Sequence, residues 1–177
     1  MTLGAWFATL RHLPDAPPMF SDPLIARMTS FVSGIGIGVR AADLIEPTFL
    51  PGLDIRFGTL VVDEARLLYP GDLLHEAGHI AVAAPEERER EKLKPTLGDE
   101  ITAIAWSYAA ACHLGIDPAI VFHPAGYRGA SSAFLTNFAA GRYVGTPLLQ
   151  CYGMTIEPKR ALAEGSKPFP SMLRWVR

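Results

Sequence analysis

The fold of this chain is organised around the stretch Asp72-Leu73-Leu74-His75-Glu76-Ala77-Gly78-His79-Ile80-Ala81-Val82. No proline interrupts it, and its apolar and small residues favour an α-helix. In a helix, residues four apart project from the same side, so His75 and His79 share a face. The opposite face consists of small and apolar residues, which predicts a back buried in the core: Leu73, Ala77, Ile80 and Ala84. Asp72 follows Pro70-Gly71 and is a suitable N-cap.

The two histidines and Glu76 form the pattern HExxH. Each imidazole can give one nitrogen to a single metal ion, and Glu76 lies about 100° around the helix from His75, near enough to reach a water on that ion. Two neutral nitrogen ligands and a carboxylate base are parts of a zinc hydrolase. The alternative is a surface helix that carries two histidines and an acid.

This pentapeptide resembles the signature of the zincin metallopeptidases. The resemblance covers little more than one helix, and it implies that His75 and His79 bind zinc while Glu76 is the general base. Metzincins have a glycine and a further histidine shortly after the motif, and residues 80–87 contain neither. That subclass is therefore excluded.

Catalytic zinc usually has a third protein ligand. The chain is similar to the gluzincins, in which a glutamate from a second, downstream helix completes the site, and this resemblance implies Glu100. Glu100 opens the apolar segment 101–112, an interior helix that can hold a carboxylate rigidly. Asp99 would then accept a hydrogen bond from a liganding histidine. The segment departs from the thermolysin-type pattern, because it lacks the asparagine before the glutamate and the aspartate four residues after it.

Both acids also have a structural interpretation. Thr96-Leu97-Gly98-Asp99 has the form of a capping box, and acids in a first helical turn are favoured by the helix dipole without any metal. His123 is the competing third ligand, since a loop can fold back over the site. His113 is about 20 Å along the helix from Glu100 and cannot bind the same ion. His12 lies in a Pro-rich segment that we expect at the periphery.

The stretch His123-Pro124-Ala125-Gly126-Tyr127-Arg128-Gly129 is a second candidate for catalytic residues. A zinc hydrolase must stabilise an oxyanion, commonly with a histidine, tyrosine or arginine donor. His123, Tyr127 and Arg128 all offer such donors. The alternative is an ordinary loop whose glycines supply turn geometry.

Length and composition predict one small α+β domain over residues 1–177, with residues 1–20 and 165–177 as peripheral segments. Residues 22–31 are expected to form a helix that starts at Asp22-Pro23, and residues 131–138 another. Residues 53–57 and 59–63 flank Gly58 and are expected to be strands. By the zincin resemblance, 59–63 is the candidate strand for pairing with a substrate, and a purely structural strand is the alternative.

The remaining composition limits partners and compartment. A net charge of −2 gives no long-range attraction to nucleic acid or to an anionic membrane. The N-terminus lacks the basic region and long apolar stretch of a secretory signal, and no run reaches about 18 apolar residues. We therefore expect a cytoplasmic protein with no nucleic-acid or membrane partner. Cys112, within an apolar helix, is expected to be a buried, inert thiol.

These observations predict a small zincin-like domain with one Zn²⁺ that hydrolyses a peptide or a small amide substrate. One alternative is a regulatory or structural module that binds zinc without turnover. Another is ferrous iron chemistry, which two histidines and a carboxylate also suit. The glutamate between the histidines favours hydrolysis.

Overall fold

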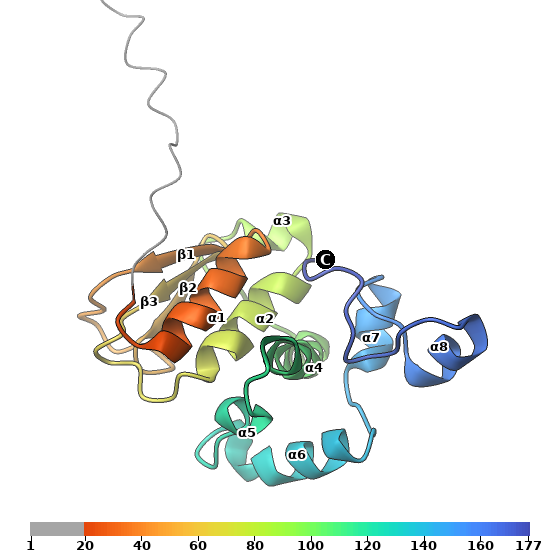
Figure 1. Cartoon of the computed structure of the whole chain (residues 1–177). Coiled ribbons are helices and arrows are strands. Elements are labelled where there is room, and N and C mark those ends of the chain that lie inside the picture. The colour runs from red at the N-terminus through yellow and green to blue at the C-terminus, as the bar shows by residue number, and fades with distance from the viewer. Residues whose placement is uncertain (1–19) are drawn as a thin grey trace, which may run out of the picture.

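A computed structural model of the chain describes residues 20–177. Residues 1–19, which include His12 and nearly all of the expected N-terminal peripheral segment, lie outside the described residues. The described part is an α+β fold, in which a small three-stranded sheet lies at one side and helices pack against it (Figure 1). This confirms the predicted class, with one helix that carries the HExxH motif and a second that carries Glu100.

The sheet has the strand order β1-β3-β2. Its strands are β1 (Gly38–Ala41), β2 (Leu53–Arg56) and β3 (Thr59–Val62), with β1 parallel and β2 antiparallel to β3. Phe57 and Gly58 form the β2–β3 turn with φ angles of 49° and 66°. Positive φ at both central residues is the geometry whose twist suits a two-residue hairpin. The two predicted strands are confirmed to within one residue at their ends.

The position of β3 corrects one expectation. Because β3 lies between β1 and β2, both of its edges are already paired, and it cannot pair with a substrate. Leu60, Val61 and Val62 are buried, so β3 is a core strand, as the structural alternative held. All four residues of β2 line the open groove described below, whereas β1 and β3 contribute one residue each, Arg40 and Val61.

Helix α1 (Pro23–Gly34) begins as predicted and ends three residues later than expected. Asp22 is its N-cap and accepts hydrogen bonds from the amides of Leu24 and Ile25 at 2.7 and 3.1 Å. These contacts satisfy two of the amides that the first turn of a helix leaves unpaired. The Asp-Pro pair was therefore a reliable start signal.

Helix α2 (Asp72–Val82) carries the HExxH motif, and its N-cap is Gly71. The expected N-cap Asp72 is wrong, because Asp72 is the first helical residue and its carboxylate binds His123 instead. A Cβ atom at Gly71 would lie 2.0 Å from the carbonyl oxygen of Ile120. This position therefore requires glycine, because the chain passes directly against the next segment.

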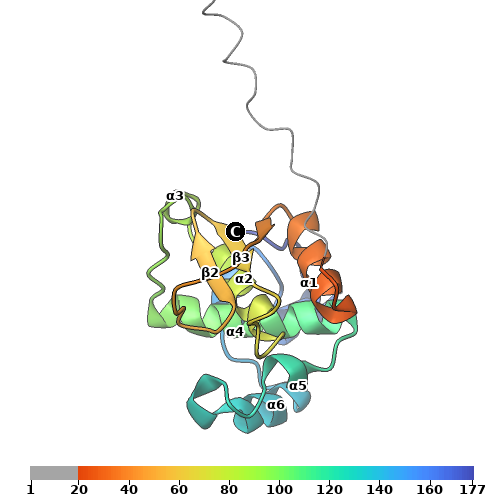
Figure 2. The same cartoon turned by 90° about the vertical axis from the view of Figure 1, so that its left-hand side faces the viewer.

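Helix α4 (Leu97–Leu114) crosses α2 steeply and is its main packing partner. Figure 1 shows α4 nearly end-on and Figure 2 shows it lengthwise, with α2 between α4 and the sheet. Gly78 lies at the crossing, where a Cβ atom would be 3.0 Å from the carbonyl oxygen of Ala103 and 3.3 Å from the ring of Trp106. The glycine of the motif thus lets the two site helices approach closely.

Six further helical segments complete the secondary structure of residues 20–177. They are α3 (Pro85–Arg88), α5 (Pro118–Val121), the 3₁₀ turn η1 (Tyr127–Gly129), α6 (Ser131–Ala139), α7 (Thr146–Cys151) and α8 (Pro158–Glu164). Helix α6 confirms the predicted helix at residues 131–138. Buried residues of α1, the sheet, α2, α4 and the C-terminal segments form one continuous core.

The C-terminal segment lies against α2 and α4 and is anchored in the core. Phe169 is buried, and the ring nitrogen of Trp106 donates to the carbonyl oxygen of Trp175 at 2.8 Å. The amide of Arg177 donates to the carbonyl oxygen of Ala81 at 2.9 Å. This segment thereby satisfies a carbonyl at the C-terminal end of α2.

The expectation of a buried Cys112 is wrong. Burial of α4 extends through Ala111 and stops where the helix runs past the core, so Cys112 is exposed. Its pKa is nevertheless raised, because partial desolvation disfavours the thiolate.

Candidate metal centre

Helix α2 brings His75 and His79 together one turn apart. Their Nε2 atoms are 3.1 Å apart, and the two residues are only 8% and 7% exposed. As predicted, Leu73, Ala77 and Ile80 on the back of the helix are fully buried. The expectation for the fourth residue, Ala84, is wrong, because α2 ends at Val82 and Ala84 is a half-buried N-cap of α3. Burial of this back fixes the rotation of α2 and turns both imidazoles toward α4.

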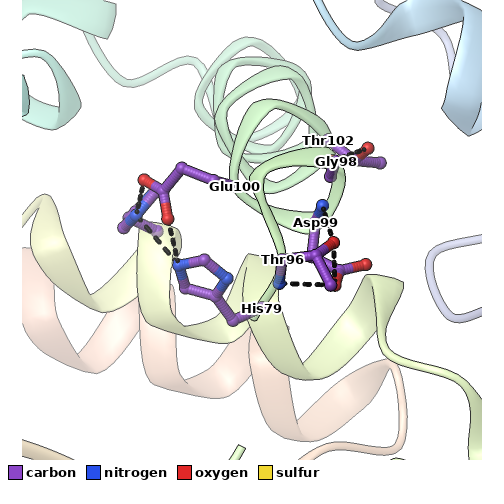
Figure 3. A network of polar contacts seen from close by, with 7 residues as sticks. His79, Thr96, Gly98, Asp99, Glu100 and Thr102 are labelled. Atoms are coloured by element: carbon purple, nitrogen blue, oxygen red, sulfur yellow. Dashed lines mark hydrogen bonds and ion pairs between the residues drawn. The ribbon is translucent and has the colours of Figure 1, made fainter. Parts of the chain in front are cut away.

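Glu100, in the first turn of α4, completes the cluster. Its Oε1 lies 3.2 Å from Nε2 of His75, and its Oε2 lies 3.3 Å from Nε2 of His79. Figure 3 shows Glu100 reaching from α4 across to His79. One donor atom from each of the three residues lies within 4.8 Å of the others. The carboxylate therefore spans both histidines.

The spacing of these atoms fits a metal ion. Two ligands at about 2.0–2.1 Å from a tetrahedral ion are about 3.3 Å apart, close to the separations observed here. Both histidines direct Nε2 inward, while their Nδ1 atoms are buried and have no hydrogen-bond partner in the described residues. Neutral nitrogens and one carboxylate are a donor set that suits first-row divalent ions. The group formed by His75, His79 and Glu100 could thus hold a metal ion.

The charges within the cluster perturb one another. Hydrogen bonds from His75 and His79 hold the pKa of Glu100 well below its usual range, against the opposing effect of burial. Burial alone would lower the pKa of His79, but its hydrogen bond to Glu100 and the charge of Glu76 outweigh burial and raise it. The negative carboxylate of Glu100 therefore favours a positive charge in the space that the cluster encloses.

Glu76 is next to His75 on α2 and is partly buried. Burial raises its pKa, and the nearby histidines oppose that rise. Glu76 is not part of the triad of possible ligands, but it lines the same groove as all three. Its carboxylate is thus placed beside the cluster and remains free of it.

Asp99 does not contact either histidine by a hydrogen bond. Its Oδ2 accepts hydrogen bonds from the amide and the hydroxyl of Thr96 at 2.9 and 2.7 Å, and its own amide donates to the Thr96 hydroxyl at 3.2 Å. Figure 3 shows this capping box on the side of α4 away from Glu100. The expected contact with a liganding histidine is wrong, because the N-terminal cap of α4 already uses this carboxylate.

His123 lies near the cluster but outside it. Its Nε2 is 3.0 Å from Oδ1 of Asp72, and its ring stacks on Tyr69 with centroids 3.9 Å apart. Its Nδ1 is buried without a partner in the described residues. Glu100, and not His123, is the residue that the fold brings to His75 and His79.

Tyr127 and Arg128 follow on the same loop with left-handed φ angles of 53° and 52°. Two successive non-glycine residues in this region are strained, and such strain clusters at functional sites. The ring of Tyr127 packs edge-on against His75 with centroids 5.3 Å apart. Its hydroxyl is buried, and burial together with the charge of Asp72 raises its pKa. The exposed Arg128 lines the groove and has no polar partner in residues 20–177.

Sequence reasoning missed the role of Asp72 and Tyr69. Asp72 precedes Glu76 by four residues, so helical spacing alone would have placed the two on one face. This signal was available, but the expected N-cap role concealed it. No pattern pointed to Tyr69, because its stacking on His123 joins residues more than 50 positions apart.

The cluster opens onto a groove of about 1610 Å³. This exceeds the roughly 300–1,000 Å³ of typical small-molecule pockets. Strand β2, the β1–β2 connection, the start of α4 and the 123–130 loop all line it. The groove is therefore large enough for an extended chain.

Comparison of the sequence with protein-family models, with curated proteins and with solved structures finds no match. Among residues 20–177, no helix combines the length and apolarity needed to cross a bilayer.

Proposed function

We propose that this chain is a zinc-dependent hydrolase of the zincin type, most similar to gluzincins, which cleaves a peptide or another amide. The observation that carries the proposal is the placement of Glu76 beside three convergent ligands, all on one open groove. Two imidazole nitrogens and a carboxylate leave coordination positions for water and substrate. A buried structural metal site has no need of either the groove or an additional carboxylate.

His75, His79 and Glu100 would hold the zinc. When bound, zinc supplies a Lewis acid that polarises a carbonyl and lowers the pKa of a water. Glu76 accepts the proton of the attacking water and delivers it to the leaving amine. Arg128 is the donor that remains free to face the oxyanion, because Nε2 of His123 is paired with Asp72 and the Tyr127 hydroxyl is buried.

The arrangement of His123 and Tyr127 in the 123–130 loop supports a second candidate, a metal-binding module without turnover. Of the three expected oxyanion donors, His123 is paired through Nε2 with Asp72, and the hydroxyl of Tyr127 is buried. Such a module would retain the triad while the loop stays in its present arrangement. The two candidates differ in whether Glu76 has any effect on chemistry.

Substitution of Glu76 by glutamine separates them. Glu76→Gln should retain the metal and the fold while hydrolysis falls by at least about 100-fold, because the amide cannot accept the water proton. The measurement is cleavage of a panel of peptide and simple amide substrates by wild type and by the variant at equal zinc content. Undiminished hydrolysis by the variant would refute the mechanism. A zinc-loaded wild type that cleaves nothing on the panel would favour the module.

A further inference from the structure

Three large apolar side chains on the rim of the groove are almost completely exposed. Phe49 is 98% exposed, Ile45 84% and Leu97 80%, and all three line the groove that contains the triad. They come from two separate segments, the β1–β2 connection and the first residue of α4. Exposed apolar side chains that gather around one opening mark a contact surface more often than scattered ones do.

Further apolar side chains line the groove, among them Leu93, Ile101 and Phe134. Charged side chains also line the groove away from the triad, among them Arg40, Asp43, Glu46, Lys92 and Arg128. The three exposed rim residues therefore offer an apolar contact surface within a lining that is otherwise mixed.

Strand β2, the edge strand that lines the groove, does not offer a free row of donors. The amide of Asp63 donates to the carbonyl of Gly52. In β2, the backbone amides and carbonyls of the even-numbered residues therefore point to β3, and those of the odd-numbered residues point outward, away from the sheet. The outward amides of Leu53, Ile55 and Phe57 already donate within the chain. Their acceptors are the carbonyl of Leu50 at 3.2 Å, Oδ1 of Asp54 at 2.9 Å and the carbonyl of Glu91 at 3.3 Å.

Asp54 is itself held in this position. Its Oδ2 is 2.7 Å from Nε of Arg56, which leaves Oδ1 on the amide of Ile55. A substrate that added to β2 as a further strand would have to displace these contacts first. Backbone pairing at this edge is therefore disfavoured.

We propose that the groove binds extended polypeptide segments through their large apolar side chains, which Ile45, Phe49 and Leu97 contact, and not by strand addition to β2. This inference rests on the proposed function, because it names the substrate class of the same site. The groove's volume suits a chain of several residues, and its exposed rim gives each apolar side chain a surface to cover.

The test uses the full chain with Glu76→Gln, so that a bound peptide stays intact whether or not the wild type hydrolyses it. Two fluorescent peptides of equal length and charge are compared by anisotropy, one with Phe and Leu and the other with Ser and Asn at the same positions. The apolar peptide should bind at least about tenfold more tightly. Phe49→Ser combined with Ile45→Ser should abolish most of this preference and leave the metal content unchanged.

Leu162 on α8 provides the matched control. It is 87% exposed, and Figure 1 shows α8 at the opposite end of the fold from the sheet. Leu162→Ser should change the affinity by less than about twofold. Asp54→Ala, which frees the Ile55 amide, should also change it by less than about twofold in the chain that retains Phe49 and Ile45.

Four results of the peptide-binding experiment would overturn the inference. The first two are equal affinity for the two peptides and no binding of either. The third is a loss of affinity in Leu162→Ser as large as that in the rim variant. The fourth is tighter peptide binding by Asp54→Ala that persists when Phe49 is replaced. Sedimentation of the wild type and of Phe49→Ser tests whether the chain forms a dimer through the rim. A dimer that Phe49→Ser dissociates would assign the rim to a second copy of the chain. Failure of hydrolysis would leave the binding result intact, whereas failure of peptide binding would leave zinc content and cleavage of small amides unaffected.

Discussion

The α2–α4 crossing and the rim of the groove differ in how they are built. At the crossing, His75 and His79 are 8% and 7% exposed, and a third ligand arrives from a helix that packs tightly against them. On the rim, Phe49 and Ile45 project into solvent from a connection without regular structure. Metal binding is thus fixed by core packing, while substrate contacts lie on segments that the core does not constrain.

This difference separates chemistry from recognition. A change at the rim should alter affinity for substrate without disturbing the metal, because the rim side chains are almost completely exposed and do not pack in the core that holds the ligands. A change among the ligands should remove the metal and leave the rim in place. The predictions below test this independence, beginning with the largest effect.

The largest effect is expected at Glu100. Glu100→Gln replaces a charged ligand by a neutral amide, so bound zinc should fall from about one ion per chain to well below half after dialysis against a weak chelator. His75→Ala combined with His79→Ala should remove it almost entirely. Elemental analysis of purified protein measures both, with circular dichroism to verify the fold.

Two variants serve as controls for this loss. Asp99→Asn alters the adjacent carboxylate that caps α4, and His123→Ala alters the imidazole of the loop. Both should keep zinc near the wild-type level. If His123→Ala lost zinc and Glu100→Gln retained it, the third ligand would be His123 of the loop. The metal site would then not be confined to the α2–α4 crossing.

A smaller effect is expected at Asp72, which joins α2 to the 123–130 loop on the wall of the groove. Asp72 belongs to α2, yet its carboxylate holds His123 of the loop, and both residues are buried. Asp72→Ala should lower the free energy of unfolding by about 1–3 kcal/mol, because His123 would be left buried without a partner. Zinc content should not change. Urea unfolding of the zinc-loaded proteins measures the difference.

Asp72→Asn is the matched control, since it keeps an oxygen acceptor at the same place and should lose less stability. Zinc loss in Asp72→Ala at full folding would contradict the separation, because it would show that the loop supports the ligands. Equal stability of the wild type and Asp72→Ala would mean that the pair contributes nothing.

The sequence predicted those features that depend on residues close together in the chain, and it missed those that depend on residues far apart. His75, His79 and the buried back of α2 depend on spacing within one helix, and the helix and its buried face are as expected except at Ala84, which lies beyond the end of α2. Glu100 required a further step, because its approach to α2 depends on the crossing at Gly78. That step came from a resemblance to gluzincins and could not come from periodicity.

The groove could not be predicted in the same way. The strands at 53–57 and 59–63 were found from their pattern, but their order in the sheet was not, so β3 was expected to pair with a substrate although both of its edges are already paired. Asp72 was assigned to its own helix end, whereas its partner His123 is 51 residues away. Local patterns do not encode such pairings, because they arise only when the whole chain is packed.

The smallest effect concerns Glu64, a surface residue outside both regions. Its carboxylate accepts hydrogen bonds from the amides of Asp22 and Ser21 at 2.6 and 3.1 Å, and these bonds lower its pKa. Because the folded pKa is the lower one, this stabilisation is present above the unfolded value of about 4.3 and is lost as pH falls through the folded value. Glu64→Gln should therefore be slightly less stable than the wild type at neutral pH, and the difference should vanish in acid.

Urea unfolding of both proteins at several pH values between about 7 and about 3 measures this convergence. Zinc-free protein is used throughout so that loss of metal does not contribute. A difference that grows as the pH falls would refute the assignment. Since Glu64 contacts neither the ligands nor the rim, zinc affinity at neutral pH should be the same in both proteins, which makes this variant the baseline for the two larger effects.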